Sequence, residues 1–141
     1  MLSGFQLDAR LQQDTITICE DDKLLCLLMN DQRYPWVILV PRQPDLAELH
    51  ELPPAQYHEL MEISWQLGQD LMALFQGDKL NVAAIGNIVR QLHIHHVVRT
   101  VEDASWPAPV WGVGKAIPYT PDQLDARLQE LRRSLRLAQS Y

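Results

Sequence analysis

Three short apolar segments follow one another within the first 41 residues, and only turn-forming residues separate them. Residues 15–19 alternate between polar and apolar side chains, a pattern typical of a β-strand with one buried face. Residues 24–29 and 36–40 are continuous apolar runs, which favours strands that are buried on both faces. A polar turn at residues 30–35 separates these two runs, and Pro41 ends the second. Because the three segments are so closely spaced, the sequence predicts an antiparallel meander.

A long amphipathic helix is predicted after the meander. Pro53 and Pro54 suit its first turn, and Gly77 suits its end. Between them, apolar side chains recur at steps of three and four residues, which is typical of a helix face packed on a core. This apolar set includes Leu60, Ile63, Leu67, Leu71, Leu74 and Phe75.

Two more strands and two shorter helices complete the expected order. Residues 80–85 and 89–98 are predicted as the fourth and fifth strands, with a Gly-Asn turn between them. Residues 7–13 carry two leucines at helical spacing and predict a short first helix. Thr120 suits the N-cap of a last helix, which begins with a proline and carries leucines at helical spacing.

Length and composition fit one soluble domain. The chain has 141 residues, of which 47% are hydrophobic and 21% are charged. We therefore predict an α+β fold: about five antiparallel strands in one sheet, one long helix packed on it, a short N-terminal helix and a C-terminal helix. The single domain is expected to span residues 1–141, with its core at about 15–111 and a C-terminal loop and helix at 112–141.

Charge and hydropathy argue against two classes of partner. The formal net charge is −6, and the first hundred residues contain no cluster of lysine and arginine, which argues against nucleic-acid binding. The apolar runs are too short to span a bilayer, so no membrane partner is expected. The first residues show no signal-peptide pattern, and the two cysteines, Cys19 and Cys26, are expected as reduced thiols. These features together predict a cytoplasmic protein.

Three of the chain's five histidines lie within four positions of the predicted fifth strand. Because side chains alternate along a strand, Gln91, His93 and His95 are expected on one face and His96 on the other. Few structural roles require two imidazoles on one face. Three chemistries fit such a pair: covalent catalysis by one imidazole, plain binding of a phosphate, and binding of zinc with a third ligand from elsewhere.

The order of these elements and the histidine motif resemble the histidine-triad (HIT) family of nucleotide-binding hydrolases and transferases. The family motif is His-φ-His-φ-His-φ-φ, with φ apolar, and residues 91–97 read Gln-Leu-His-Ile-His-His-Val. Residues 37–42 resemble the family's strand that ends in proline and a basic residue, and Trp106-Pro107 resembles the tail of some branches. The resemblance covers most of the chain, from about Thr15 to Trp111.

Three positions depart from the family pattern. Gln91 replaces the first histidine, which resembles a bacterial-type branch of the family. His96 stands where an apolar residue is usual, and Trp36 occupies a position where some members carry a further histidine. The middle histidine, which the family's chemistry requires, is His93.

The resemblance implies a metal-independent nucleotide hydrolase that needs no cofactor. Its substrates would be nucleoside phosphoramidates or dinucleoside polyphosphates. His93 would attack the α-phosphorus and form a covalent nucleotidyl-histidine, from which water releases the nucleoside monophosphate. His95 would bind a phosphate oxygen and help to protonate the leaving group, while the backbone of Gln91 would orient His93. Arg99, just after the motif, could be a phosphate partner or a strand-end charge, and the second interpretation is favoured.

Other residues are expected to bind the nucleotide. Asn87, in the predicted turn, is the candidate for a further phosphate contact, and Asn30 or Asp31 for the ribose hydroxyls. Trp106 and Trp111 are candidates to close over the site. Family members usually pair their long helix and fourth strand across a two-fold axis, so a homodimer is expected.

Two other functions stay open. The missing first histidine fits a nucleotide-binding or sensing module with weak catalysis. A zinc-dependent hydrolase that uses His93 and His95 is the second alternative. Its third ligand would come from His50, His58 or a carboxylate, although these two histidines are expected to face solvent.

Overall fold

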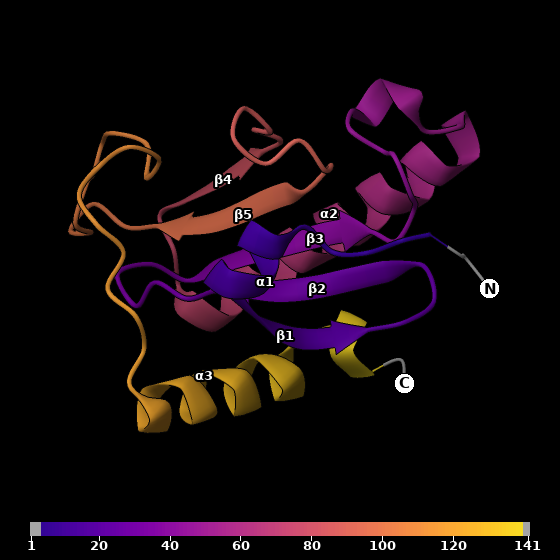
Figure 1. Cartoon of the computed structure of the whole chain (residues 1–141). Coiled ribbons are helices and arrows are strands. Elements are labelled where there is room, and N and C mark those ends of the chain that lie inside the picture. The colour runs from indigo at the N-terminus through magenta and orange to yellow at the C-terminus, as the bar shows by residue number, and fades with distance from the viewer. Residues whose placement is uncertain (1–3, 140–141) are drawn as a thin grey trace.

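The computed structural model of the chain describes residues 4–139. Its centre is a five-stranded antiparallel sheet with the strand order β1-β2-β3-β5-β4 (Figure 1). The strands are β1 (Thr15–Glu20), β2 (Leu24–Met29), β3 (Trp36–Pro41), β4 (Lys79–Ala83) and β5 (Ile94–Arg99). The helices are α1 (Ala9–Asp14), α2 (Pro54–Phe75) and α3 (Pro121–Ser134), with short 3-10 turns η1 (Leu49–Glu51) and η2 (Arg136–Gln139). The predicted α+β fold, with one long helix and a shorter helix on either side of it in sequence, is confirmed.

The meander predicted from the first apolar segments forms β1, β2 and β3. Each strand pairs antiparallel with the next, and the two apolar runs of β2 and β3 are buried along almost their whole length. Strand β1 is buried more on one face than on the other, as its alternating sequence requires. The meander therefore follows directly from hydrophobic patterning.

The chain returns to the sheet after α2 as β4 and β5. Strand β5 lies between β3 and β4 and pairs antiparallel with both, so β5 is interior and β4 is an edge. In this register, His95 lies opposite Ile38 and His96 lies opposite Val37. The second half of the histidine motif is thus held by hydrogen-bonded strands on both sides.

The sheet is covered on both faces. Helices α2 and α3 pack on one face, and α1 lies on the other, as Figure 1 shows. The core on the α2 side includes Ile18, Cys26, Val37, Leu39, Leu60, Leu67, Leu71, Ile94, Val98 and Leu131. The core on the α1 side includes Leu11, Leu25, Leu27, Tyr34, Trp36, Ile38, Val40, Val97 and Val110. The two faces separate the histidines of β5, because neighbouring side chains point to opposite faces.

The predicted boundaries of β4 and β5 are wrong. Strand β4 spans Lys79–Ala83 and not 80–85, and β5 begins at Ile94 and not at Val89. The preceding residues bond to other segments: the Leu92 amide donates to the Leu46 carbonyl at 2.9 Å. Apolar residues such as Val89 and Leu92 recur before the strand, so the prediction began the strand several residues too early.

Helix α2 ends at Phe75, two residues before the glycine that was expected to stop it. Gln76 takes the left-handed conformation at the C-cap, with φ of 52°. Gly77 follows it, and a Cβ atom there would collide with Val98 and approach Met72. The glycine is needed for close packing between the helix end and β5, and not for the turn itself.

Cys19 and Cys26 carry free thiols and face each other across β1 and β2. Cys26 is buried and Cys19 is half-buried, which agrees with the expectation of reduced thiols. Within residues 4–139, no helix is long and apolar enough to cross a membrane. The domain limits of 1–141 stay a prediction, and residues 1–3 and 140–141 lie outside the described part of the chain.

Candidate active site

His93 lies immediately before β5 and is only 5% exposed. Its Nδ1 atom lies 2.7 Å from the backbone carbonyl oxygen of Gln91. A carbonyl only accepts, so Nδ1 carries the proton and donates it. The lone pair of the ring is therefore on Nε2, the nitrogen that a nucleophile of this kind would use.

His95 has the opposite arrangement of protons. The indole Nε1 of Trp36, on β3, donates a hydrogen bond of 2.9 Å to His95 Nδ1. Because an indole nitrogen only donates, Nδ1 of His95 is an acceptor, and the ring proton of the neutral form is on Nε2. The two neighbouring imidazoles thus present different groups, a lone pair on His93 and an N–H donor on His95.

Aromatic rings surround His95. The centroids of His93 and His95 are 4.8 Å apart with an angle of 72° between the rings. Trp111 lies 5.2 Å from His95, and Trp36 lies 5.7 Å from it, centroid to centroid. Burial, with smaller contributions from the nearby His93 and His96, lowers the pKa of His95 to about 3. His95 is consequently neutral at physiological pH.

His96 lies on the other face of the sheet, as alternation predicted. Its side chain is fully buried, with Nδ1 at 3.3 Å from the Val37 carbonyl and Nε2 at 2.7 Å from the Ser64 hydroxyl of α2. The carbonyl requires a proton on Nδ1, so the hydroxyl donates to Nε2. Burial lowers the pKa of His96 to about 4, although two backbone hydrogen bonds oppose this effect. Both ring nitrogens of His96 therefore have hydrogen-bond partners, and the residue is part of the core.

Gln91 uses its backbone and its side chain for different contacts. The carbonyl oxygen binds His93, as described above, whereas the side-chain amide binds the N-terminal segment. Its Oε1 accepts from the Asp8 amide at 2.9 Å, and its Nε2 donates to the Gln6 carbonyl at 3.0 Å. These bonds fix the loop that carries His93 to the start of α1.

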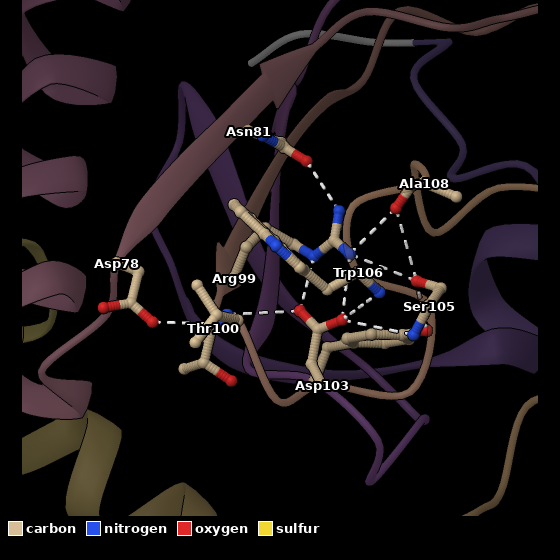
Figure 2. A network of polar contacts seen from close by, with 10 residues as sticks. Asp78, Asn81, Arg99, Thr100, Asp103, Ser105, Trp106 and Ala108 are labelled. Carbon is tan, nitrogen blue, oxygen red and sulfur yellow. Dashed lines mark hydrogen bonds and ion pairs between the residues drawn. The ribbon is translucent and has the colours of Figure 1, made fainter.

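Arg99 is a buried ion-pair partner, so its interpretation as a strand-end charge is wrong. Its side chain is 1% exposed, and Nε and Nη2 donate to the carboxylate of Asp103 at 2.7 and 2.9 Å. Further bonds reach Asn81, Ser105 and the Ala108 carbonyl, as Figure 2 shows. All three guanidinium nitrogens therefore donate to β4 or to the loop that follows β5.

This loop brings one of the two predicted tryptophans to the histidines. Trp111 packs edge-on against His95 and Trp36, with ring centroids 5.2 and 6.0 Å apart. Its Nε1 is buried and has no hydrogen-bond partner among residues 4–139. Trp106 instead lies 5.6 Å from the guanidinium of Arg99, and its bond to Pro107 is cis.

The predicted nucleotide-binding residues lie in different surroundings. Asn87 is exposed in the loop between β4 and β5. The Asn30 side chain accepts from the Tyr119 amide at 2.9 Å. Asp31 is buried, pairs with Arg33 at 2.8 Å and accepts from the Ile117 amide. Asn30 and Asp31 thus hold the segment before α3, and the three nucleotide contacts stay predictions.

A large hollow of the protein does not contain the histidines. It has a volume of about 630 Å³ and lies on the α2 side of the sheet, where Leu24, Pro41, Leu52 and Leu60 line it. His50 and His58 are exposed, as expected. In the described part of the chain, no three histidine, cysteine or acidic side chains converge on a possible metal position. The chemistry of the histidine pair, and not the size of a cavity, therefore identifies the candidate site.

Sequence reasoning missed the contact between Trp36 and His95. Trp36 had been noted only as a departure from the family pattern. The signal that could have found it is the pairing of the third and fifth strands, which places a side chain of one beside the histidines of the other. The ion pair between Arg99 and Asp103 was also missed, and no sequence signal indicates it, because only the turn after β5 brings the two side chains together.

Comparisons with known proteins agree on one family. The HIT domain profile matches residues 10–102. A histidine triad protein from Marinobacter aquaeolei VT8 is 46% identical, with a TM-score of 0.92 over 96% of this chain and 99% of that chain. One from Bradyrhizobium japonicum is 40% identical, with a TM-score of 0.88 over 94% of this chain and 98% of that chain. One from Sinorhizobium meliloti 1021 is 38% identical, with a TM-score of 0.90 over 96% and 100%.

A comparison with curated proteins finds no significant match. The profile nevertheless covers well over half of the chain, and the three structures share its fold almost from end to end. The five-stranded antiparallel sheet, the long helix and the histidine motif are those that the sequence resemblance implied. The chain therefore belongs to the HIT domain family.

Proposed function

We propose that the protein binds nucleotides and hydrolyses nucleotide derivatives at the α-phosphate through a covalent nucleotidyl-His93. Candidate substrates are nucleoside phosphoramidates and dinucleoside polyphosphates, and the product is a nucleoside monophosphate. The observation that carries this proposal is the complementary protonation of the pair. Nε2 of His93 offers a lone pair to phosphorus, and Nε2–H of His95 offers a donor to a phosphate oxygen.

In the first step, His93 Nε2 attacks the α-phosphorus and a P–N bond forms. The bond from phosphorus to the leaving group breaks, and its electron pair stays with the leaving group. The ring becomes positively charged, and the Gln91 carbonyl, 2.7 Å from Nδ1, stabilises this charge through the hydrogen bond. The substitution of glutamine for the first histidine preserves this contact because it involves only the backbone.

In the second step, water attacks the same phosphorus and the P–N bond breaks. The nucleoside monophosphate leaves, His93 returns to its neutral form, and the proton from water goes to solvent. Throughout, His95 stabilises the charge on the non-bridging oxygens by hydrogen bonding. Asn87 is proposed as a further phosphate contact, and Asn30 or Asp31 as a contact to the ribose.

Replacement of His93 tests the proposal. His93→Ala should abolish release of nucleoside monophosphate from diadenosine polyphosphates while nucleotide binding persists. Brief incubation of the native protein should yield a mass increase of one nucleotidyl group on His93, detected under alkaline conditions that preserve P–N bonds. The matched control is His58→Ala, which removes an exposed imidazole of α2 and should leave turnover unchanged. Full turnover by His93→Ala would contradict covalent catalysis by this residue.

The two alternatives give different results in the same assays. A sensing module would bind nucleotide tightly and release no product over hours, even with His93 intact. A zinc hydrolase would lose activity to chelators and regain it with zinc. The contacts of His95 favour the metal-free route, because Nδ1 is occupied by Trp36 and Nε2 carries the proton that a metal would have to displace.

A homodimer is proposed on the basis of the sheet edge. Within residues 4–139, strand β4 pairs only with β5, and its Val82 side chain is 50% exposed. Trp65 of α2, 66% exposed, is a second large apolar side chain without cover. Light scattering after size exclusion should give twice the mass of one chain, and Val82→Lys should shift the protein towards monomer. A monomeric native protein would contradict this part of the proposal.

A further inference from the structure

We infer that His95 does not supply a proton to the leaving group, and that the preferred substrates are nucleotidyl compounds whose leaving group departs as a stable anion. Phosphates, polyphosphates and carboxylates meet this condition, whereas amines and alkoxides do not. The inference rests on the proposed function, because it concerns the first step at His93. Its basis is the hydrogen bond between Trp36 and His95.

A histidine acts as a general acid only when both ring nitrogens carry protons. Nε2 of His95 already holds one proton, so a second would have to bind Nδ1. That position accepts the indole N–H of Trp36 at 2.9 Å, and an indole cannot reverse the bond because it has no lone pair to offer. Protonation of Nδ1 would therefore place two N–H groups against each other.

The surroundings also oppose a second proton on His95. The side chain is 4% exposed, and Trp36 is 6% exposed, so water cannot relieve the broken hydrogen bond without a rearrangement. The titratable groups that act on His95 are His93 and His96, and both disfavour a positive charge on it. The low pKa of His95, about 3, is consistent with this arrangement.

His93 offers no replacement for the missing acid. During the first step its Nε2 is forming the bond to phosphorus, and its Nδ1 proton is donated to the Gln91 carbonyl. Arg99 donates to Asp103 from Nε and Nη2 and to Asn81 of β4 from Nη1. When the bond to the leaving group breaks, the electron pair therefore remains on the departing atom without a proton. This is favourable for an oxyanion of phosphate or carboxylate and unfavourable for an amide anion.

The experiment measures how the first step depends on the leaving group. A series of aryl esters of adenosine monophosphate with substituents of increasing electron withdrawal is mixed with excess protein, and formation of nucleotidyl-His93 is followed in a single turnover. We expect the rate to rise steeply as the phenol becomes more acidic. General acid catalysis is worth about 10²–10⁴-fold. Adenosine phosphoramidate should thus react slower than diadenosine polyphosphate by about that factor.

Two matched variants test whether the hydrogen bond from Trp36 causes this dependence on the leaving group. Trp36→Phe and Trp111→Phe each replace one indole beside His95 with a phenyl ring, but only the first removes the N–H that binds Nδ1. Trp36→Phe should make the rate less dependent on the leaving group and raise phosphoramidate turnover at least about tenfold relative to the polyphosphate, since part of the 10²–10⁴-fold acid effect becomes accessible. Trp111→Phe should keep the native dependence, whatever its overall rate.

A readout independent of activity uses ¹⁵N-labelled protein without ligand. Two-bond nitrogen–proton correlation spectra of the native protein should show His95 with its proton on Nε2 and should show it neutral at pH 5. A native spectrum with the proton on Nδ1 would overturn the inference before any kinetics. Equal single-turnover rates across the ester series would also overturn it, and would leave covalent catalysis intact. Failure to form nucleotidyl-His93 with any compound would instead refute the proposed function.

Discussion

Replacement of Asp103 with asparagine should lower the free energy of unfolding by about 3 kcal/mol, because it breaks a buried ion pair and leaves Arg99 charged. The side chains of Arg99 and Asp103 are 1% and 6% exposed. The Asp103 carboxylate accepts from Nε and Nη2 of Arg99 and from the amides of Thr100, Ser105 and Trp106. Asparagine removes the charge and turns one acceptor of this set into a donor (Figure 2).

Two independent considerations give this magnitude. Burial raises the pKa of Asp103, but the hydrogen bonds from Arg99 and the backbone outweigh it and lower the pKa from 3.8 to about 2. Since one pKa unit corresponds to about 1.4 kcal/mol, the charged form gains about 2 kcal/mol from its surroundings. Removal of one partner from a buried ion pair typically costs about 3–5 kcal/mol. The expected loss of about 3 kcal/mol lies between the first value and the lower end of the second range.

Urea unfolding, followed by tryptophan fluorescence and by circular dichroism, measures the loss. The matched control is Glu20→Gln, which breaks the ion pair to Arg42 at 2.7 Å between side chains that are 53% and 32% exposed. That variant should lose less than about 1 kcal/mol. If Asp103→Asn loses no more than Glu20→Gln, the buried network does not stabilise the fold in the way its contacts indicate.

The pH dependence of this loss has a definite sign. The folded-state pKa of Asp103 is below its ordinary value, so the stabilisation is complete above about pH 4 and is lost as the pH falls towards 2. The native protein and Asp103→Asn should therefore converge in stability as acid is added. A difference that stays constant down to pH 2 would assign the loss to packing and not to charge.

Two further predictions concern the buried histidines. Ser64→Ala leaves Nε2 of His96 without its partner and should cost about 1–3 kcal/mol in urea unfolding, with no change in the pKa of any exposed group. Because burial lowers the pKa values of His95 and His96 to about 3 and about 4, the unfolded chain takes up two more protons than the folded one between these values and 6.5. The free energy of unfolding should thus fall by about 3 kcal/mol for each unit by which the pH decreases near pH 5. His96→Gln should reduce this slope by about half.

The parts of the fold that the sequence predicted are those that depend on local patterning. Alternation and continuous apolar runs identified β1, β2 and β3, and spacing of three and four residues identified α2. The separation of His95 from His96 by face follows from the same periodicity. The start of β5 was not predictable in this way, because apolar residues also recur in the loop before it and the backbone there bonds to a distant segment.

The burial of Arg99 shows that a charged residue need not be exposed when its ion-pair partner lies in a neighbouring loop. An arginine at the end of a strand normally reaches solvent, and nothing in its immediate sequence contradicts that interpretation. Asp103 lies four residues on, after the strand has ended, and only the turn of the chain brings its carboxylate to the guanidinium. Neutralisation by a partner allows burial that composition alone would argue against.

The chemistry of the site depends on something that no motif contains, namely which nitrogen of each imidazole holds the proton. For His93 the answer comes from the backbone two residues earlier, so the change from histidine to glutamine at position 91 leaves it intact. For His95 it comes from Trp36, which is 59 positions away in the sequence and adjacent only because β3 pairs with β5. The departure from the family pattern that looks most serious in the motif is therefore conservative in its hydrogen bonding. The departure at Trp36, outside the motif, is the one that decides whether this site can protonate a leaving group.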